Sequence, residues 1–395
     1  MNAEPRIALN PRIRAIALLG PGAVTTAGWD ALVPDDEPFL SHAFLAGLEA
    51  SGSLRAELGW QPQHLGIFAG ERLVAALPTY LKYNSHGEFV FDHAWAEAHH
   101  RVGIEYYPKL LAAVPYSPVP GPRLLVAPDR SDAEALKREL LDALIEAARA
   151  SEIASAHVNF IAAPDQALGE RAGWIGRSDV QFHWHNRNYA DFEQFLAVLN
   201  HKRRKEIRRE RRQALSAGWH FELRHGDELS ASELARVHAL YLHTFADKGN
   251  YPALTADFFA ALAAALGRRM VAVLGFRGGR IGAMALCLRS RDTLYGRYWG
   301  SDEPTQGLHF EACYYQGIDY AIREGLSRFQ PGAQGEHKIA RGFMPVRTHS
   351  LHWIAHPGLR DAIASACERE RRWLDQYEQS IAAHSPYRAT DAHAD

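Results

Sequence analysis

Cysteine is scarce in this sequence. Its three residues, Cys287, Cys313 and Cys367, are spread over 395 positions and form no Cys-x-x-Cys pair. This spacing argues against a disulfide framework and a cysteine-rich zinc site. It also fits a reducing compartment, so we expect the protein to be cytoplasmic.

Long apolar runs and an excess of one charge are missing as well. The apolar stretch 15–24 is interrupted by Gly20, Pro21 and Gly22, and no stretch reaches the ~18 apolar residues that a membrane-spanning helix needs. Lysine and arginine total 44 against 46 acidic residues, a net charge of -2. This balance excludes a uniformly basic nucleic-acid coat but leaves room for a local basic patch.

Several catalytic signatures are absent. The sequence contains no G-x-G-x-x-G, G-x-x-x-x-G-K-[ST], H-E-x-x-H or G-x-S-x-G. Their absence disfavours nucleotide hydrolases, zinc proteases and α/β-hydrolases. His183 and His185 share one face of a predicted strand, but no third ligand is evident, so we expect no metal site.

The composition is that of a folded protein with two domains. The chain is 47% hydrophobic and 23% charged, and 395 residues exceed what one compact core usually holds. Strand and helix patterns alternate in both halves, which predicts an α+β (α/β-layered) fold with mixed sheets flanked by helices. We place the domains at residues 1–190 and 191–395, with a basic helix over 200–215 at the seam.

Periodicity and turn residues give the expected elements. Strands are predicted at 65–69, 73–80, 88–91, 156–161, 181–185, 219–223, 270–276, 281–288 and 293–299. Helices are predicted at 131–150, at 191–199 running on into 202–212, and at 230–246, 255–266, 308–324 and 361–383.

The densest group of chemically capable residues lies in segments 308–318 and 329–343. Gly332 and Gly335 would let a ligand approach backbone amides, and Lys338 could stabilise an oxyanion or a phosphate. The residues able to accept a proton from an attacking amine are His309, Glu311, Glu336 and His337. The alternative is a loop held by surface ion pairs, with His309 and Glu311 beginning a helix.

Segment 293–299 places an arginine among aromatic residues. Alternation along a strand predicts Tyr295, Arg297 and Trp299 on one face, and Gly296 and Tyr298 on the other. Such an arginine could bind a carboxylate or a phosphate. The alternative is an aromatic core strand with one satisfied arginine.

Two further groups are candidates for binding. Asp92, His93 and Lys109, beside a proline-rich loop, could line a pocket or could serve as packing between domains. Segment 202–212 has eight basic and two acidic residues and begins with Lys202, Arg203, Arg204 and Lys205. These four residues could contact the phosphates of a nucleic acid or coenzyme, and they also allow an RNA-binding function. The alternative is a solvated helix of mixed charge.

Taken together, several segments resemble a known family. They are Ser41-His42-Ala43-Phe44-Leu45, Val114-Pro115-Tyr116 with Gly121-Pro122, 202–212, Tyr295-Gly296-Arg297-Tyr298-Trp299-Gly300, 308–317 and Pro331-Gly332-Ala333-Gln334-Gly335-Glu336-His337-Lys338. Over about residues 38–356 the chain resembles the FemAB-like (peptidoglycan biosynthesis/recognition) family of the GCN5-related N-acyltransferase (GNAT) superfamily.

The resemblance implies two tandem GNAT-like domains and an N-acyltransferase. The co-substrate would be an aminoacyl-tRNA or an acyl-CoA, the acceptor an amine on a small molecule or peptide, and no cofactor would be bound permanently. Lys338 looks like the family's lysine near the reacting carbonyl, and Arg297 and Tyr298 would orient substrate or donor. The alternative is a non-catalytic module that recognises a peptidoglycan peptide or an amine.

The sequence departs from these patterns in two places. The coenzyme A pattern Q/R-x-x-G-x-G/A is reduced to Gln306-Gly307 before the helix predicted at 308, which marks few backbone amides for a pyrophosphate. No long heptad arm is inserted in the second half. We expect a thioester donor rather than tRNA, because one short basic helix offers few contacts for tRNA.

Overall fold

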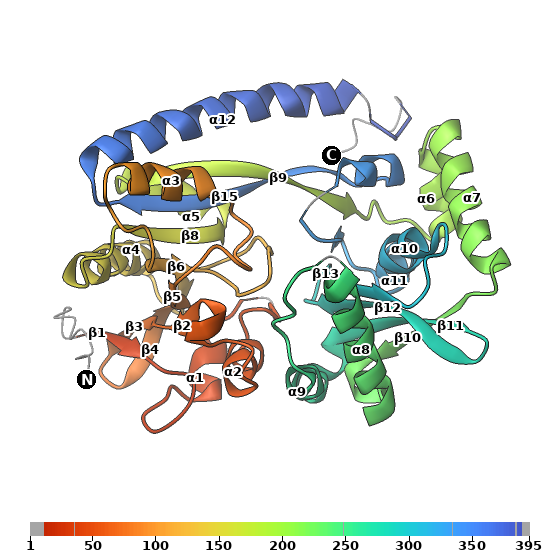
Figure 1. Ribbon diagram of the computed structural model, residues 1–395, viewed down its shortest axis with the longest axis horizontal. Helices are drawn as coiled ribbons and strands as arrows, with labels where there is room; N and C mark the ends of the chain where they lie inside the picture. The colour runs from red at the N-terminus through yellow and green to blue at the C-terminus, as the bar shows by residue number, and fades with distance from the viewer. Residues whose placement is uncertain (1–11, 35, 248, 334, 384, 389–395) are drawn as a thin grey trace. The chain divides into compact units, whose positions relative to one another are not determined.

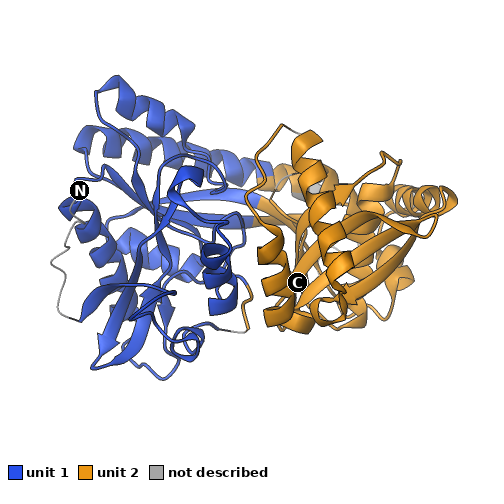
Figure 2. Cartoon of the chain, turned by 60° about the horizontal axis from the view of Figure 1, so that its bottom comes forward, with its two compact units in different colours: residues 1–34, 39–180, 347–377 blue, residues 35–38, 181–346, 378–395 orange. Residues whose placement is uncertain are grey.

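The computed structural model describes residues 12–34, 36–247, 249–333, 335–383 and 385–388. The chain forms two compact units (Figure 2). Unit 1 comprises residues 1–34, 39–180 and 347–377, and unit 2 comprises residues 35–38, 181–346 and 378–395. This division differs from the expected boundary at 190, because residues 347–377 return to the first unit. The assignment of each half to a GNAT-like domain stays a prediction.

Unit 1 combines two sheets with helices (Figure 1). Its elements are β1 (Ile13–Ile16), α1 (Thr26–Asp30), α2 (His42–Ala50), β2 (Trp60–Pro62), β3 (His64–Ala69), β4 (Arg72–Leu77), β5 (Thr79–Lys82), α3 (His93–Arg101), β6 (Lys109–Ala112), β7 (Leu125–Val126), α4 (Ala133–Ala150), β8 (Ser155–Ile161), α5 (Ala163–Arg171) and most of α12 (Pro357–Ala383).

The smaller sheet of unit 1 has the order β1-β3-β4-β7, with antiparallel neighbours. In the other sheet β8 lies between β15 (Met344–Ile354), to which it is antiparallel, and β6, to which it is parallel. β5 and β2 follow β6. The predicted helix 131–150 is confirmed as α4, whose apolar stripe includes Leu136, Leu140 and Leu144 and packs into the core of the unit.

Unit 2 contains one mixed sheet. Its elements are α6 (Phe192–Val198), α7 (His201–Ser216), β10 (His220–His225), α8 (Ala231–Asp247), α9 (Ala256–Leu266), β11 (Met270–Arg277), β12 (Arg280–Arg289), β13 (Thr293–Ser301), α10 (Leu308–Phe310), α11 (Gln316–Arg323) and β14 (Arg328–Gln330). β9 (Ile175–His185) and β15 each pass from one unit into the other.

Helices cover both faces of the sheet in unit 2. Strands β10 to β13 are antiparallel in chain order, β14 joins β13 in parallel, and the end of β9 pairs with β14. Neighbouring residues of β13 mark the two faces, because the Tyr298 ring meets Tyr241 of α8 and the Trp299 ring meets His309 of α10. Helices α8 and α9 therefore cover one face, and the helix that begins with α10 covers the other (Figure 1).

One predicted strand is wrong. Segment 88–91 is a loop, in which Glu88 turns inward to the ammonium of Lys109 and Phe89 adopts a left-handed backbone with φ 58°. A buried ion pair replaces the ladder hydrogen bonds that the apolar letters suggested. This loop forms a wall of a pocket described below.

Two other expectations need correction. The helix predicted to run through 191–212 is two helices, because Asn200 caps α7 by accepting a hydrogen bond from the Arg203 amide at 3.1 Å. Strand β15 was not predicted, since its first half carries Pro345 and Arg347 rather than an apolar alternation. By contrast, Thr255 caps α9 as expected, accepting from the Phe258 amide at 3.2 Å.

The predicted α+β class, with mixed sheets flanked by helices, is confirmed. Within the described ranges, we find no helix that combines the length and the apolar character needed to cross a bilayer.

Candidate active site

Helix α7 presents two different surfaces. Ile207, Glu210 and Ala214 are buried against the rest of unit 2. The opposite surface and α6 together form an open groove of about 510 Å³, which we call the basic groove; its lining is Glu193, Ala197, His201, Arg204, Lys205, Arg208 and Arg212. The helix thus joins a cationic surface to the interior of the unit.

Glu210 ties three segments together on the buried side of α7. Its carboxylate accepts hydrogen bonds from the Arg341 guanidinium, with Nε at 3.1 Å, and from the Tyr315 hydroxyl. The Arg341 guanidinium also lies 3.5 Å from the centre of the Phe310 ring. These contacts hold the 3₁₀ turn 336–341 against both α7 and the helix that starts at Leu308.

That helix contains a π-turn, Glu311–Tyr315, between α10 and α11. Such turns insert one extra residue and are frequent at functional sites. The Glu311 carboxylate is fully buried and accepts two 3.1 Å hydrogen bonds from Arg211 and one at 2.8 Å from Gln316. A proton-accepting role for Glu311 would therefore compete with an ion pair already formed.

Lys338 is buried without a carboxylate partner in the described chain. The residue is 3% exposed, and its Nζ donates a 2.6 Å hydrogen bond to the Gly332 carbonyl. Burial lowers the pKa of Lys338 to about 8; Arg297 adds to the lowering, whereas Cys313 of the π-turn opposes it. The amine is thus close to its titration point at neutral pH.

Two glycines shape the loop that carries Lys338. Gly332 and Gly335 have φ values of 99° and 117°, a region that side chains rarely adopt. A Cβ on Gly335 would lie 2.3 Å from the His337 ring. The glycines expected to allow close backbone approach thus let the loop fold back on itself, and Gln334 between them lies outside the described residues.

The two candidate histidines meet at Tyr314. The Tyr314 hydroxyl lies 2.9 Å from Nε2 of His337, and its ring centre lies 5.4 Å from that of His309. Partial burial lowers the pKa of His337, and Arg341 and Lys338 lower it further. His337 is therefore a neutral imidazole at neutral pH and can accept a proton.

Arg297 lies at a β-bulge of β13. Leu286 and Cys287 of β12 are opposite Tyr298 and Gly296, which leaves Arg297 as the extra residue. The predicted alternation is therefore broken: Trp299 faces α10, and the Arg297 guanidinium lies 5.5 Å from the Tyr298 ring centre. Burial lowers the pKa of Arg297.

Tyr295 is held elsewhere in unit 2. It donates a 2.7 Å hydrogen bond to Glu37, and burial, followed by Glu37, raises its pKa well above the usual value. The structure thus brings together Lys338, His337, His309, Glu311 and Gly332 around the π-turn, with Arg297 close enough to affect the pKa of Lys338.

The cations of segment 202–212 do not all line the basic groove. Arg204 and Lys205 line the basic groove, whereas Lys202 and Arg203 do not, and Arg203 pairs with Glu206 at 3.0 Å. Across the described residues no ion pair forms at Arg204, Lys205 or Arg212, so three cations of the groove lack a protein counter-charge.

The remaining candidates, Asp92 and Lys109, belong to unit 1 and are buried. Lys109 Nζ donates to Glu88 at 2.9 Å and to Asp92, and the exposures of Lys109 and Asp92 are 1% and 3%. Burial disfavours the charge on Lys109, but the two carboxylates outweigh it and raise its pKa. These residues form an ion-pair network and line none of the pockets described here.

Sequence analysis missed Glu210, Arg341 and Tyr314 as parts of the site. The one available signal was Glu210 itself, an acidic residue at helical spacing from Ile207 and Ala214 on the inner side of a basic helix. Arg341 and Tyr314 gave none, because their partners lie far away in the chain.

The fold of the chain resembles those of other solved structures. The chain resembles the structure of FemX with a TM-score of 0.53 and 12% identity, covering 86% of this chain and 98% of that one. It also resembles the C-terminal domain of a putative lysylphosphatidylglycerol synthetase from Agrobacterium fabrum, with a TM-score of 0.50, 12% identity and coverage of 85% and 93%. At such identities the likeness concerns the fold.

Among curated proteins, no sequence match is found. The sequence profile of the FemAB-like family, described as peptidoglycan biosynthesis/recognition, matches residues 22–389. The match spans nearly the whole chain, and we conclude that the chain belongs to the FemAB-like family.

Proposed function

We propose that the protein is an N-acyltransferase that moves an acyl or aminoacyl group to an amine. The observation that carries this proposal is Lys338, a buried amine with a pKa of about 8, a neutral carbonyl as its partner and the Arg297 guanidinium nearby. A positive charge that is already positioned in a site of low polarity stabilises the negative charge that develops in the transition state.

The proposed reaction is direct attack on the donor carbonyl. The nitrogen of a neutral amine forms a bond to the carbonyl carbon, and the oxyanion of the tetrahedral intermediate is stabilised by the Lys338 ammonium. The C–O bond of an ester donor, or the C–S bond of a thioester, then breaks. The neutral imidazole of His337 takes the proton from the attacking nitrogen and passes it to the leaving oxygen or sulfur, which leaves the imidazole neutral again.

The basic groove supports a polyanionic donor. The groove is lined by three cations, Arg204, Lys205 and Arg212, that form no ion pair within the described residues. Such unpaired cations on one surface suit a phosphate backbone. On the other side of α7, Glu210 and Arg211 contact the segments that carry Lys338 and the π-turn. The same helix therefore links donor binding to the proposed reacting groups.

A second feature favours aminoacyl-tRNA over acyl-CoA. Gly307 precedes the helix that begins at Leu308, where a pyrophosphate would meet free backbone amides. The Glu210 carbonyl of α7 lies 2.6 Å from where a Cβ on Gly307 would be. This backbone oxygen, which carries a partial negative charge, leaves little room for a pyrophosphate at the helix start, so we propose an ester donor and an amine of a peptidoglycan precursor as the acceptor.

The test uses two variants of α7 with matched charge and spacing. Lys205→Ala/Arg212→Ala removes two cations from the basic groove, and Lys202→Ala/Arg209→Ala removes two from outside it. We expect the first variant to weaken binding of charged tRNA and to reduce the slope of log affinity against log salt by about 2, at roughly 0.9 per phosphate contact. The control should stay close to the parent.

The outcomes separate the alternatives. Saturable binding of coenzyme A without tRNA binding would replace the ester donor by a thioester. Equal weakening by both variants would remove the basic groove from the proposal. Absence of transfer from charged tRNA and from acyl-CoA to peptidoglycan-precursor amines would favour the non-catalytic recognition module.

A further inference from the structure

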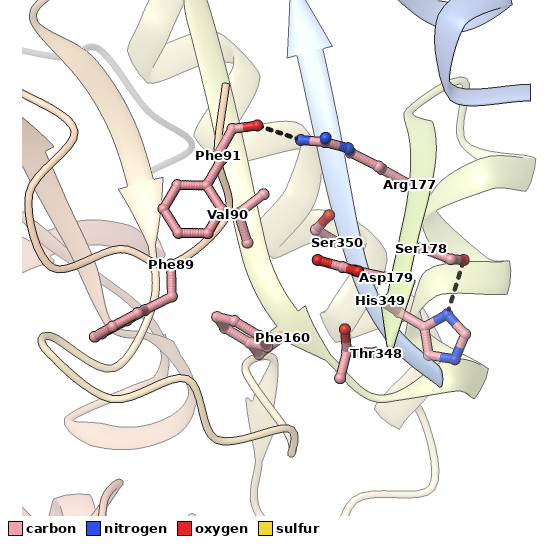
Figure 3. Close-up of a pocket in the computed structure, with 10 residues that line it drawn as sticks. All are labelled: Phe89, Val90, Phe91, Phe160, Arg177, Ser178, Asp179, Thr348, His349 and Ser350. Atoms are coloured by element: carbon pink, nitrogen blue, oxygen red, sulfur yellow. Dashed lines mark hydrogen bonds between the residues drawn. The ribbon is translucent and has the colours of Figure 1, made fainter. Parts of the chain in front are cut away.

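Unit 1 contains a small pocket that the proposed transfer reaction does not use. Its volume is about 40 Å³, and its walls come from the loop after β5, the end of β8, the first half of β9 and the middle of β15 (Figure 3). Phe89 and Phe160 line it with left-handed backbones, φ 58° and 55°. Bulky residues adopt this strained conformation rarely, and such strain collects at ligand sites.

The pocket carries one negative charge that is not neutralised by an ion pair. The Asp179 carboxylate, which is exposed to solvent, lies beside Thr348 and faces the phenylalanine wall (Figure 3), and it accepts a 2.7 Å hydrogen bond from the Val180 amide. Arg177, also in the wall, is paired through Nε with Glu370 at 2.7 Å. A carboxylate opposite aromatic rings suits a cation.

The hydroxyl groups of the pocket add acceptors. Thr348 is 3% exposed, and within the described residues its hydroxyl has no hydrogen-bond partner. Ser350 is 4% exposed, and its Oγ lies 2.8 Å from Nε2 of His352. Which of these last two atoms donates decides what Ser350 can offer a ligand.

A buried chain of hydrogen bonds that starts at Asp92 determines which of the two atoms is the donor. Burial favours a neutral Asp92, but Lys109 and the bonds from Lys109 and Tyr106 outweigh it and lower its pKa, so Asp92 is a carboxylate. The Tyr106 hydroxyl must therefore donate to Asp92. Tyr106 then has only lone pairs to offer Nε2 of His157 at 3.3 Å. Ser155 Oγ, 2.9 Å from the same nitrogen, can either accept or donate, so the arrangement that satisfies both contacts places the proton on Nε2.

The protonation of His157 fixes that of His352. Burial lowers the pKa of both imidazoles well below the usual value, so each carries one proton. The two Nδ1 atoms are 2.8 Å apart, and because His157 is protonated on Nε2, His352 must donate from Nδ1. Nε2 of His352 is then an acceptor, and the Ser350 hydroxyl donates to it. The opposite arrangement would set lone pairs of Tyr106 and His157 against each other.

Ser350 therefore presents lone pairs, and not its proton, to the pocket. With Asp179 it offers acceptors, and an ammonium group has three N–H donors and no acceptor. We propose that this pocket of unit 1 binds the protonated head of a small primary amine, with Asp179 as its counter-charge and the phenylalanines around its carbon atoms. The buried residues from Asp92 to His352 are positioning residues, which keep Ser350 as an acceptor.

The first experiment measures binding of ethylammonium chloride to the full-length protein by calorimetry and ligand-observed NMR, with 1-propanol and sodium acetate as neutral and anionic probes of similar size. Ethylammonium should bind and the other two should not. Asp179→Asn should weaken binding at least tenfold, whereas Asp129→Asn, at an exposed aspartate of the same unit, should leave it unchanged. Acetate binding, or equal binding of 1-propanol, would overturn the proposal.

A second measurement tests the positioning chain and needs no activity. Nitrogen-15 spectra of the histidine rings should show His157 protonated on Nε2 and His352 on Nδ1. The Tyr106→Phe variant removes the bond to Asp92 and should weaken ethylammonium binding only if it alters this pattern. The opposite tautomers in the parent protein would overturn the inference that Ser350 is an acceptor. None of these readouts depends on acyl transfer, so the pocket can fail while the transfer proposal stands.

Discussion

Lys109 in unit 1 and Lys338 in unit 2 are both buried lysines, and they differ in their partners. Lys109 lies between two carboxylates and its pKa is raised; Lys338 bonds to the Gly332 carbonyl and its pKa falls to about 8. A buried ammonium that is paired with carboxylates of the same protein already has its charge neutralised within the fold. One without them can respond to charge that arrives with a substrate.

Lys82 shows that a lowered pKa is not sufficient to mark a site. Its Nζ bonds to two oxygens of Asn84, each at 2.7 Å, and burial lowers its pKa to about 7. Lys338 differs in its surroundings, because it lies on a glycine loop and near Arg297 and the π-turn. The comparison of Lys109 with Lys338 is therefore best tested by removing each charge in turn.

The largest effect is expected for Lys109→Met. This variant leaves Glu88 and Asp92 buried without their ammonium, which should lower the free energy of unfolding by about 3–5 kcal/mol. Denaturant unfolding of the variant and the parent would measure it. A loss of less than about 1 kcal/mol, the range of an exposed pair, would mean that Lys109 is not the anchor of unit 1.

Lys338→Met should show the reverse pattern. It removes a buried charge that has no carboxylate partner in the described chain, so we expect unchanged or slightly higher stability. The rate of acyl transfer should fall by roughly 10²–10³, the usual cost of losing one oxyanion donor. Lys137→Met, at a lysine of unit 1 whose side chain is 29% exposed and pairs with Asp165, serves as the control for activity. Full transfer by Lys338→Met would exclude it as the oxyanion group.

The pH dependence sharpens the same contrast. The pKa of Lys338 is about 8, so its charge is present below that pH and is lost above it. The kcat/KM for transfer should therefore fall as pH rises through about 8. Lys338→Arg keeps its charge to much higher pH, so this fall should disappear in whatever activity remains. A fall at the same pH in both enzymes would assign it to another group.

The smallest effect is expected at the surface. Arg72 and Asp129 make two 2.8 Å hydrogen bonds, but both side chains are more than half exposed. Water solvates these charges equally well in the unfolded chain, so Arg72→Met should leave the unfolding midpoint nearly unchanged. A drop comparable with that of Lys109→Met would show that burial does not control the strength of these pairs.

Local pattern predicted most elements of the fold. Apolar spacing located α4, α8 and α9, and glycine turns located the β3–β4 and β11–β12 hairpins. Segment 88–91 was misassigned because Glu88 and Asp92 are drawn to Lys109, a tertiary interaction that outweighs strand propensity. Strand β15 was missed because half of it has no apolar alternation.

The site was predictable in part, for a related reason. Glycines and a lysine within seven positions mark the loop 332–338 in the sequence itself. The ion pair of Glu210 with Arg341 spans 131 positions, and the contact of His157 with His352 spans 195. No local periodicity encodes such pairs. The selection of Lys205 over Lys202 for the basic groove likewise required the start of α7 at His201, which Asn200 sets.

Because of the π-turn, the contacts of the segment 308–323 within unit 2 depend on the exact number of residues in it. Deleting a single residue from Glu311–Tyr315 would let this segment close as regular α-helix, but it would rotate everything beyond the deletion by about 100°. Glu311 and Tyr315 then could not both keep their bonds to Arg211 and Glu210. Substitutions here would remove one contact at a time, whereas a one-residue deletion would break the contacts between α7 and the helical segment 308–323 in one step.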